Sequence, residues 1–217
     1  MSRSQTLQAI VLRTYDVGEA DRFCILFTHE RGRLAARANG VRKVKSRMGG
    51  SLLPLSAVTV GVSESRGGIL ITSAQRIEAL DRPHPSLRQF AEAEQGIELL
   101  LALTENDEPM PALFEATLGF LAACAEAPQN AVLAYRIVLL RELGLLPSGD
   151  NPRFFADLTD EEKIFLQAAR EGRFLSLPKI SSARHLRSLT ERFLGDHLRG
   201  PLKSAGVSAA LMHGSPS

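Results

Sequence analysis

Tryptophan is absent from this 217-residue sequence, and aromatic residues make up only 6% of it. A core of useful size must therefore be built mainly from Leu, Ile, Val and Ala side chains. Only two cysteines occur, Cys24 and Cys124, and they are too far apart in sequence to form a C-x-x-C pair. This excludes a zinc ribbon and a disulfide framework, so we interpret both cysteines as small core residues.

Long apolar runs are also missing. The longest, Leu99–Leu103 and residues 119–125, are far shorter than the roughly 18 residues that a membrane-spanning helix requires. The stretch that ends at Arg13 has too short an apolar run for the core of a signal peptide. We therefore expect a soluble cytoplasmic protein that does not contact a membrane.

Enzymatic signatures are missing as well. The sequence has no phosphate-binding P-loop, no GxGxxG turn and no GxSxG turn. The five histidines lack metal-ligand spacing, and we interpret His185 and His197 as surface or capping residues. The acidic run Asp160–Glu162 suits the start of a helix better than a metal site. We therefore expect no catalytic residue, no metal and no cofactor.

Charge is present but unevenly distributed, although the net charge is only +2. Residues 1–80 carry 12 Lys or Arg against 6 Asp or Glu, whereas residues 81–126 carry 2 against 9. Residues 179–217 are basic again, with 6 against 2. The pattern indicates a basic N-terminal module, an acidic middle and a basic C-terminal region. Acidic residues between 92 and 108 suit either a solvated helix face or a docking surface for a basic partner.

Alternating apolar residues predict β-structure in the first eighty residues. Leu7, Ala9 and Val11 share one face of the first strand. The predicted strands cover residues 6–14, 21–28, 33–39, 51–65 and 69–77. Five short strands at this spacing favour a small barrel or sandwich.

After residue 80 the apolar spacing becomes helical. Helices are predicted around residues 87–101, 113–124, 132–143, 160–171 and 182–198. Gly144–Pro147 and Gly172 are stop signals, and Thr159–Glu162 forms a capping box. Two prolines within residues 81–85 place the domain boundary there. The predicted fold is α+β, with a β-barrel domain over 1–80 and an α-helical domain over 81–217.

The densest charge lies in residues 31–47, which contain no acidic residue. The cations are Arg31, Arg33, Arg37, Arg42, Lys43, Lys45 and Arg47. Their mutual repulsion favours a polyanionic partner. A cationic strand beside a glycine-bounded basic loop suits contacts with nucleic-acid phosphates. The alternative is a basic loop that is only solvated.

Base stacking would need an aromatic side chain from outside this segment. Tyr15, Phe23 and Phe27 are the candidates, and we interpret both phenylalanines as core residues. A second basic cluster lies near the C-terminus, comprising Lys179, Arg184, Arg187, Arg192, Arg199 and Lys203. We expect Arg199 and Lys203 to extend a DNA path; the alternatives are a solvated face and helix capping by Arg199.

Residues 9–60 resemble the N-terminal domain of the bacterial RecO family of DNA repair proteins. The resemblance rests on GEAD after the first strand, then LFTHERGRL, a basic loop that ends in KSR, and LLP. AYRIVLLRELGLLP, at residues 134–147, is similar to the family's helix with its L-G-hydrophobic-P stop. FLGDHLRGPLKSAGVSAAL, at residues 193–211, is similar to the family's C-terminal segment.

The resemblance implies an OB-fold followed by a helical domain. It also implies a recombination mediator that binds single- and double-stranded DNA and anneals complementary strands. Family members act with RecR and the single-strand binding protein to load RecA. Since annealing breaks no covalent bond, this function agrees with the absence of catalytic motifs.

Two departures from the family pattern affect these expectations. Many members carry a four-cysteine zinc module after the L-G-hydrophobic-P helix, but residues 148–167 here contain no cysteine. Some members have basic residues before the aromatic that matches Tyr135, where they bind the acidic tail of the single-strand binding protein. Leu133 and Ala134 occupy those positions here, which leaves Arg136 or Arg141 as substitutes.

Two other classes of function remain open from the residues alone. One is a nucleic-acid-processing enzyme whose active site has no recognised motif. The other is a scaffold whose acidic helices dock partner proteins. We expect the mediator, with DNA contacts centred on residues 31–47.

Overall fold

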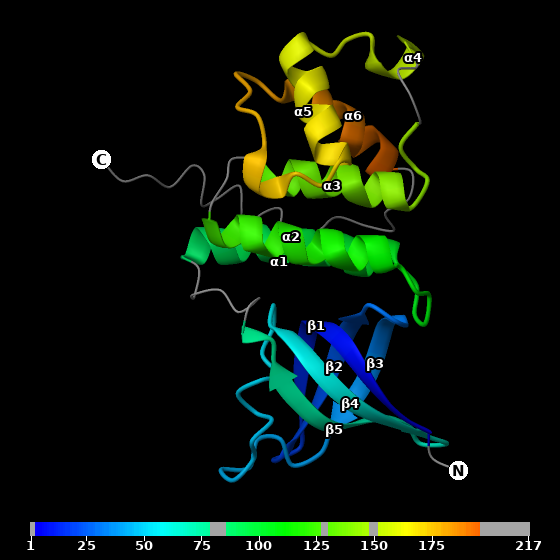
Figure 1. Cartoon of the computed structure of the whole chain (residues 1–217), viewed down its shortest axis with the longest axis vertical. Coiled ribbons are helices and arrows are strands. Elements are labelled where there is room, and N and C mark those ends of the chain that lie inside the picture. Colours follow the sequence, from blue (N-terminus) through cyan, green and yellow to red (C-terminus); the bar gives the residue numbers. More distant parts are fainter. Residues whose placement is uncertain (1–2, 79–85, 127–129, 148–151, 196–217) are drawn as a thin grey trace. The chain divides into compact units, whose positions relative to one another are not determined.

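The structure is a computed structural model that describes residues 3–78, 86–126, 130–147 and 152–195 (Figure 1). The chain divides into two compact units. One comprises Met1–Asp81 with Thr104–Leu118, and the other comprises Arg82–Leu103 with Gly119–Ser217. Within the described parts of the chain, no helix is long and apolar enough to cross a membrane.

The first unit is built on a closed five-stranded barrel. Its strands are β1 (Arg3–Val17), β2 (Asp21–Thr28), β3 (Gly32–Ala38), β4 (Ala57–Ser65) and β5 (Gly68–Arg76). They are hydrogen-bonded in the order β1-β2-β3-β5-β4, and the barrel closes between β4 and β1. Only the short β3–β5 pair among these contacts is parallel. This is the OB-fold arrangement, so the predicted fold class is confirmed.

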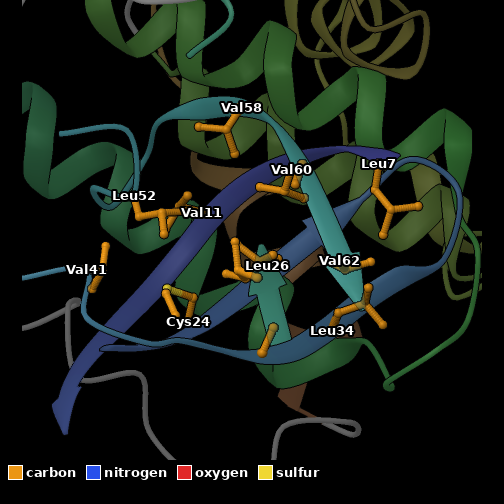
Figure 2. Close-up of a cluster of buried hydrophobic side chains, with 14 residues drawn as sticks. Leu7, Val11, Cys24, Leu26, Leu34, Val41, Leu52, Val58, Val60 and Val62 are labelled. Atoms are coloured by element: carbon orange, nitrogen blue, oxygen red, sulfur yellow. The ribbon is translucent and has the colours of Figure 1, made fainter. Parts of the chain in front are cut away.

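The barrel closes because each strand has one apolar face. Leu7, Ala9 and Val11 point inward from β1, as their alternation predicted. Cys24 and Leu26 from β2 meet them inside the barrel, together with a row of valines from β4 (Figure 2). The buried side chains are small or branched, so they fill a narrow barrel without tryptophan.

Residues 51–56 were predicted as part of the fourth strand, and that prediction is wrong. The β4 strand begins at Ala57, after a turn in which Leu55 has a positive φ of 68°. Pro54 cannot donate a ladder hydrogen bond, which favours a turn before the strand. The turn is fixed by hydrogen bonds between Val11 of β1 and the backbone of Leu55 and Ser56. Leu52 consequently packs into the barrel core (Figure 2).

A segment from the helical part of the sequence completes the first unit. The peptide N–H of Asp107 donates to the carbonyl of Arg33 at the start of β3. The helix α2 (Pro111–Glu126) then places Phe114 against Phe27 and His29, with ring centroids 6.0 and 5.5 Å apart. Phe27 is therefore buried on the outside of the barrel rather than within it.

The second unit is helical. It contains α1 (Leu87–Leu103), the later part of α2, α3 (Ala131–Glu142), α4 (Pro152–Phe155), α5 (Asp160–Arg170), a 3-10 turn η2 (Phe174–Ser176) and α6 (Arg184–Gly195). The central helix is α3, because almost every residue from Ala131 to Leu140 is buried. Its Tyr135 ring stacks on Phe120 of α2 at a centroid distance of 4.2 Å.

The predicted helix ends agree with the structure. Gly144 has a φ of 69° after α3, and Gly172 has the same φ after α5. Thr159 and Glu162 form the expected reciprocal capping box. The α4 and η2 turns were not predicted, because single turns leave no periodic pattern. The predicted end of the last helix, beyond Gly195, lies outside the described residues.

Candidate nucleic-acid interface

The seven cations of residues 31–47 are spread over two ends of the barrel unit. Arg31 and Arg33 lie at the turn into β3, while Arg37 lies at the far end of that strand. The other four belong to the loop between β3 and β4, drawn in light blue in Figure 1. We call residues 40–50 the cationic loop.

Arg31 and Arg33 hold residues 104–118 against the barrel, and we call these residues the inserted segment. The Arg31 guanidinium contacts carboxylate oxygens of Glu64 and Asp107 at 3.1 and 2.6 Å. Arg33 donates from Nε to the side-chain oxygen of Asn106 at 2.7 Å. Both guanidinium groups therefore have partners within the protein, and the charge of Arg31 is compensated by two carboxylates.

Arg37 and Arg42 are held beside the β1–β2 turn by aspartates. Arg37 donates twice to Asp21, at 3.1 and 2.7 Å. Arg42 donates to the carbonyl oxygen of Gly18 and lies 3.4 Å from Asp16. A hydrogen bond from the Gly40 N–H and those from Arg37 hold the pKa of Asp21 below its usual value. Asp21 is therefore ionised at neutral pH, and it positions both Arg37 and the start of the cationic loop.

The remaining three cations, Lys43, Lys45 and Arg47, project from the cationic loop. All three are exposed, and within the described residues no hydrogen bond or ion pair joins their side chains to a partner. The loop itself is ordered by turns, since Lys43 N–H donates to Gly40 and Ser46 N–H donates to Lys43.

Apolar side chains anchor the cationic loop to the barrel. Val41 is buried in the barrel core, and Met48 packs against it at the other end of the loop. The backbone N–H of Arg42 also donates to the carbonyl of Ala20. These anchors leave the charged residues between them facing solvent, where repulsion among like charges is relieved by binding a polyanion.

The three aromatic residues considered for base stacking differ in their exposure to solvent. Phe27 is buried beneath Phe114, as expected. Phe23 was interpreted as a core residue, and that is wrong, because its side chain is 36% exposed. The alternation of β2 contained the signal: Cys24 and Leu26 fill the barrel, so Phe23 must face outward. Tyr15, opposite Phe23 on β1, is also exposed.

The second basic cluster is only partly described. Lys179, Arg184, Arg187 and Arg192 are exposed, the last three on α6. Arg187 donates to the side-chain oxygen of Asn130 at 2.6 Å. Arg199 and Lys203 lie outside the described residues, so their proposed DNA contacts remain predictions.

The residues around Tyr135 are enclosed in the second unit. Leu133, Ala134 and Tyr135 are all buried in α3. Arg136 is buried and lies 3.7 Å from Glu191 of α6, whereas Arg141 is exposed and paired with its neighbour Glu142. Of the two substitutes considered for binding an acidic tail, Arg141 is therefore the one that faces solvent.

Neither cysteine is suited to nucleophilic chemistry. Both are buried, as predicted. Burial raises the pKa of Cys24 to about 11 and raises the pKa of Cys124 as well. Among the described residues, no group of three or more His, Cys, Asp or Glu side chains is placed to hold a metal ion.

Comparison with known proteins connects this barrel to a family. The profile described as "Recombination protein O N terminal" matches residues 1–80. A DNA repair protein RecO of Myxococcus xanthus is 30% identical over 93% of this chain and 95% of its own length. Proteins of the same name from Anaeromyxobacter dehalogenans and Salinibacter ruber are 33% and 31% identical over 66% and 71% of this chain.

The share of each relative's own length that the match covers differs from one relative to another. The matched region spans 58% of the Anaeromyxobacter dehalogenans protein and 61% of the Salinibacter ruber protein, so parts of those relatives have no counterpart in the match. The match to the Myxococcus xanthus protein, in contrast, extends over nearly the whole of both sequences. Together with the OB-fold barrel, this similarity shows that the chain belongs to the RecO family of DNA repair proteins.

Proposed function

We propose that this protein is a non-enzymatic recombination mediator that binds single- and double-stranded DNA and anneals complementary strands. The observation that carries the proposal is the cationic loop, which presents Lys43, Lys45 and Arg47 to solvent without a hydrogen-bond or ion-pair partner among the described residues. Arg37 and Arg42 extend the same basic surface. Arg31 and Arg33, which already bind Asp107 and Asn106, contribute less to DNA binding.

Annealing needs charge neutralisation rather than bond chemistry. Two DNA strands repel each other through their phosphates, and a surface of Lys and Arg lowers this repulsion while leaving base edges available for pairing. Contacts to phosphate carry no sequence information, so binding is expected to be independent of base sequence.

The proposed partners and cell compartment follow from family membership. We propose that the protein acts with RecR, and with the single-strand binding protein and RecA, in the cytoplasm on the nucleoid. We propose residues 1–80 as the nucleic-acid-binding domain and residues 81–217, apart from residues 104–118 that belong to the barrel unit, as a helical domain without a zinc module. The exposed basic face of α6, continued by Arg199 and Lys203, is the proposed extension of the DNA path.

A strand-annealing assay tests the proposal. Two complementary oligonucleotides, one with a fluorophore and one with a quencher, are mixed with protein in EDTA without nucleotide. We expect the wild type to accelerate annealing. A loop variant, in which Arg42, Lys43, Lys45 and Arg47 are replaced by Ala, should lose most of this acceleration.

A second variant controls for total charge. Replacing Arg88, Arg141, Lys163 and Arg173 by Ala also removes four positive charges, but from exposed, ion-paired positions on the helical unit. We expect this helix control to anneal strands like the wild type. A wild type that requires nucleotide or metal would contradict the proposal in favour of an enzyme, and equal losses in both variants would contradict the assignment to the cationic loop.

A further inference from the structure

Two aromatic side chains are uncovered on the outer face of the barrel. Tyr15 of β1 lies directly opposite Phe23 of β2 in the antiparallel register. Side chains that oppose each other across two strands project from the same face. Since Cys24 beside Phe23 points into the barrel core, both rings face outward. Tyr15 is 52% exposed and Phe23 is 36% exposed.

Phe27 shows how a structural aromatic residue on this side of β2 is accommodated. It follows Phe23 by four residues and therefore projects from the same face of the strand. Its ring is fully buried beside Phe114 of the inserted segment. Tyr15 and Phe23 are exposed, because within the described residues no side chain covers them as Phe114 covers Phe27. Burial therefore does not explain why aromatic residues occupy these two positions.

A positively charged side chain on β3, that of Arg37, lies beside these two rings. Arg37 of β3 lies opposite Phe23, and its half-exposed guanidinium donates two hydrogen bonds to Asp21, at 3.1 and 2.7 Å. The cationic loop begins three residues later, at Gly40, whose N–H donates to the same aspartate at 2.7 Å. Three neighbouring strands thus present two exposed rings and one positioned cation next to the basic loop.

We infer that Tyr15 and Phe23 form a stacking platform for unpaired bases of a single DNA strand whose phosphates contact Arg37 and the cationic loop. This inference rests on the proposed function and adds a strand preference to it. Aromatic rings stack on any base, so the platform is tolerant of sequence. Bases inside a duplex are already stacked on each other, so a duplex engages the phosphate contacts alone.

Paired oligonucleotides separate stacking from charge. One is oligothymidine, and the other is an abasic strand with the same number of phosphates. Replacing both Tyr15 and Phe23 by Ala should weaken binding to oligothymidine at least about tenfold, since losing the stacking of a single base lowers the affinity by about that factor. Affinity for the abasic strand and the salt dependence should not change. Ile164→Ala, which removes an exposed apolar side chain from α5, is the matched control and should bind both strands like the wild type.

Because the sequence contains no tryptophan, Phe23→Trp reports on the platform directly. We expect its fluorescence to be quenched by oligothymidine and not by the abasic strand, whereas Ile164→Trp should respond to neither. An unquenched Phe23→Trp variant, or equal losses on both strands in the double Ala variant, would overturn the platform. Equal, salt-dependent binding of both strands by the wild type would overturn the platform but leave the proposed function standing. A wild type that binds neither strand would overturn the proposed function itself.

Discussion

At the scale of single residues, the contacts of each charged group determine what it can do. Glu162 is buried at the start of α5 and accepts hydrogen bonds from the backbone N–H groups of Thr159, His185 and Leu186. Burial raises its pKa, but these hydrogen bonds and the His185 ring outweigh that effect and hold the pKa below the usual value. One carboxylate therefore joins the N-termini of α5 and α6.

Replacing Glu162 by Gln should destabilise the folded protein. The amide offers one acceptor oxygen where the carboxylate offers two, so we expect a loss of about 1–3 kcal/mol at neutral pH. A carboxylate with a lowered pKa contributes fully above its unfolded pKa of about 4.3, and this contribution is lost as the pH falls through the folded value. In urea unfolding, the difference in the free energy of unfolding between the wild type and the Glu162→Gln variant should therefore become smaller below about pH 4.

Asp160→Asn is the control for Glu162→Gln, because Asp160 is exposed on the same helix turn and should show little effect. A gap between the wild type and Glu162→Gln that stays constant with pH would show that the charge of Glu162 does not stabilise this junction.

Arg31 and Lys45 should behave in opposite ways when replaced by Ala. Arg31 is bound to Glu64 and Asp107, so its loss should reduce the free energy of unfolding by about 1 kcal/mol or less and leave the salt dependence of DNA binding unchanged. Lys45 has no described partner, so its loss should leave the free energy of unfolding unchanged. It should reduce the slope of log K against log salt concentration for single-stranded DNA by about 0.7. The reverse pattern would reassign the phosphate contacts to the turn before β3.

At the scale of elements, the barrel depends on the inserted segment 104–118. Gly32 begins β3 with a φ of 68°, and a Cβ atom there would lie 1.8 Å from the carbonyl oxygen of Glu108. Glycine is therefore required both by the backbone conformation and by the close approach of the segment. The Arg31 and Arg33 side chains hold the segment in the same place.

Comparing the stability of the Gly32→Ala and Gly18→Ala variants should isolate the effect of the close approach between Gly32 and Glu108. Both positions have a positive φ, which costs Ala about 1–3 kcal/mol, but a Cβ at Gly18 would meet nothing within 4 Å. We expect the Gly32→Ala variant to lose clearly more stability in denaturant unfolding. Equal losses would indicate that the segment is not closely packed against β3.

The elements with a repeating pattern could be predicted from the sequence, and those fixed by tertiary contacts could not. Leu7, Ala9 and Val11 identified the side of β1 that faces the barrel core, because successive side chains of a strand point to opposite faces. Ile10 and Leu12 on the other side of this strand are buried as well. The insertion of residues 104–118 leaves no periodic signal, since it depends on Phe114 meeting Phe27. Without that contact, Phe23 and Phe27 look equivalent in the sequence, although only Phe27 is covered.

The candidate site was predictable to a similar degree. Composition located the cations of residues 31–47, because an excess of one charge in one segment is visible without a structure. It could not tell paired from unpaired groups, because Asp107 and Asn106 are more than seventy residues away from Arg31 and Arg33. Because Arg31 and Arg33 hold residues 104–118, we propose Arg37 and the cationic loop as the phosphate contacts.

At the scale of the whole molecule, the charge of the protein is segregated rather than large. A net charge of only +2 conceals a basic N-terminal region and an acidic middle. Of the seven cations in residues 31–47, we propose five for phosphate contacts: Arg37, Arg42, Lys43, Lys45 and Arg47. DNA binding should therefore depend on this local surface and be strongly sensitive to salt.

The most direct test of this account is the salt dependence of affinity for single-stranded DNA. With about five phosphates neutralised, the slope of log K against log salt should be about −3.5, a loss of roughly a hundredfold between about 50 and 200 mM. The loop variant should show a slope of about −0.7, while the helix control keeps the wild-type slope. A wild-type slope near zero, or a loop variant with the wild-type slope, would contradict the assignment of DNA binding to the cationic loop.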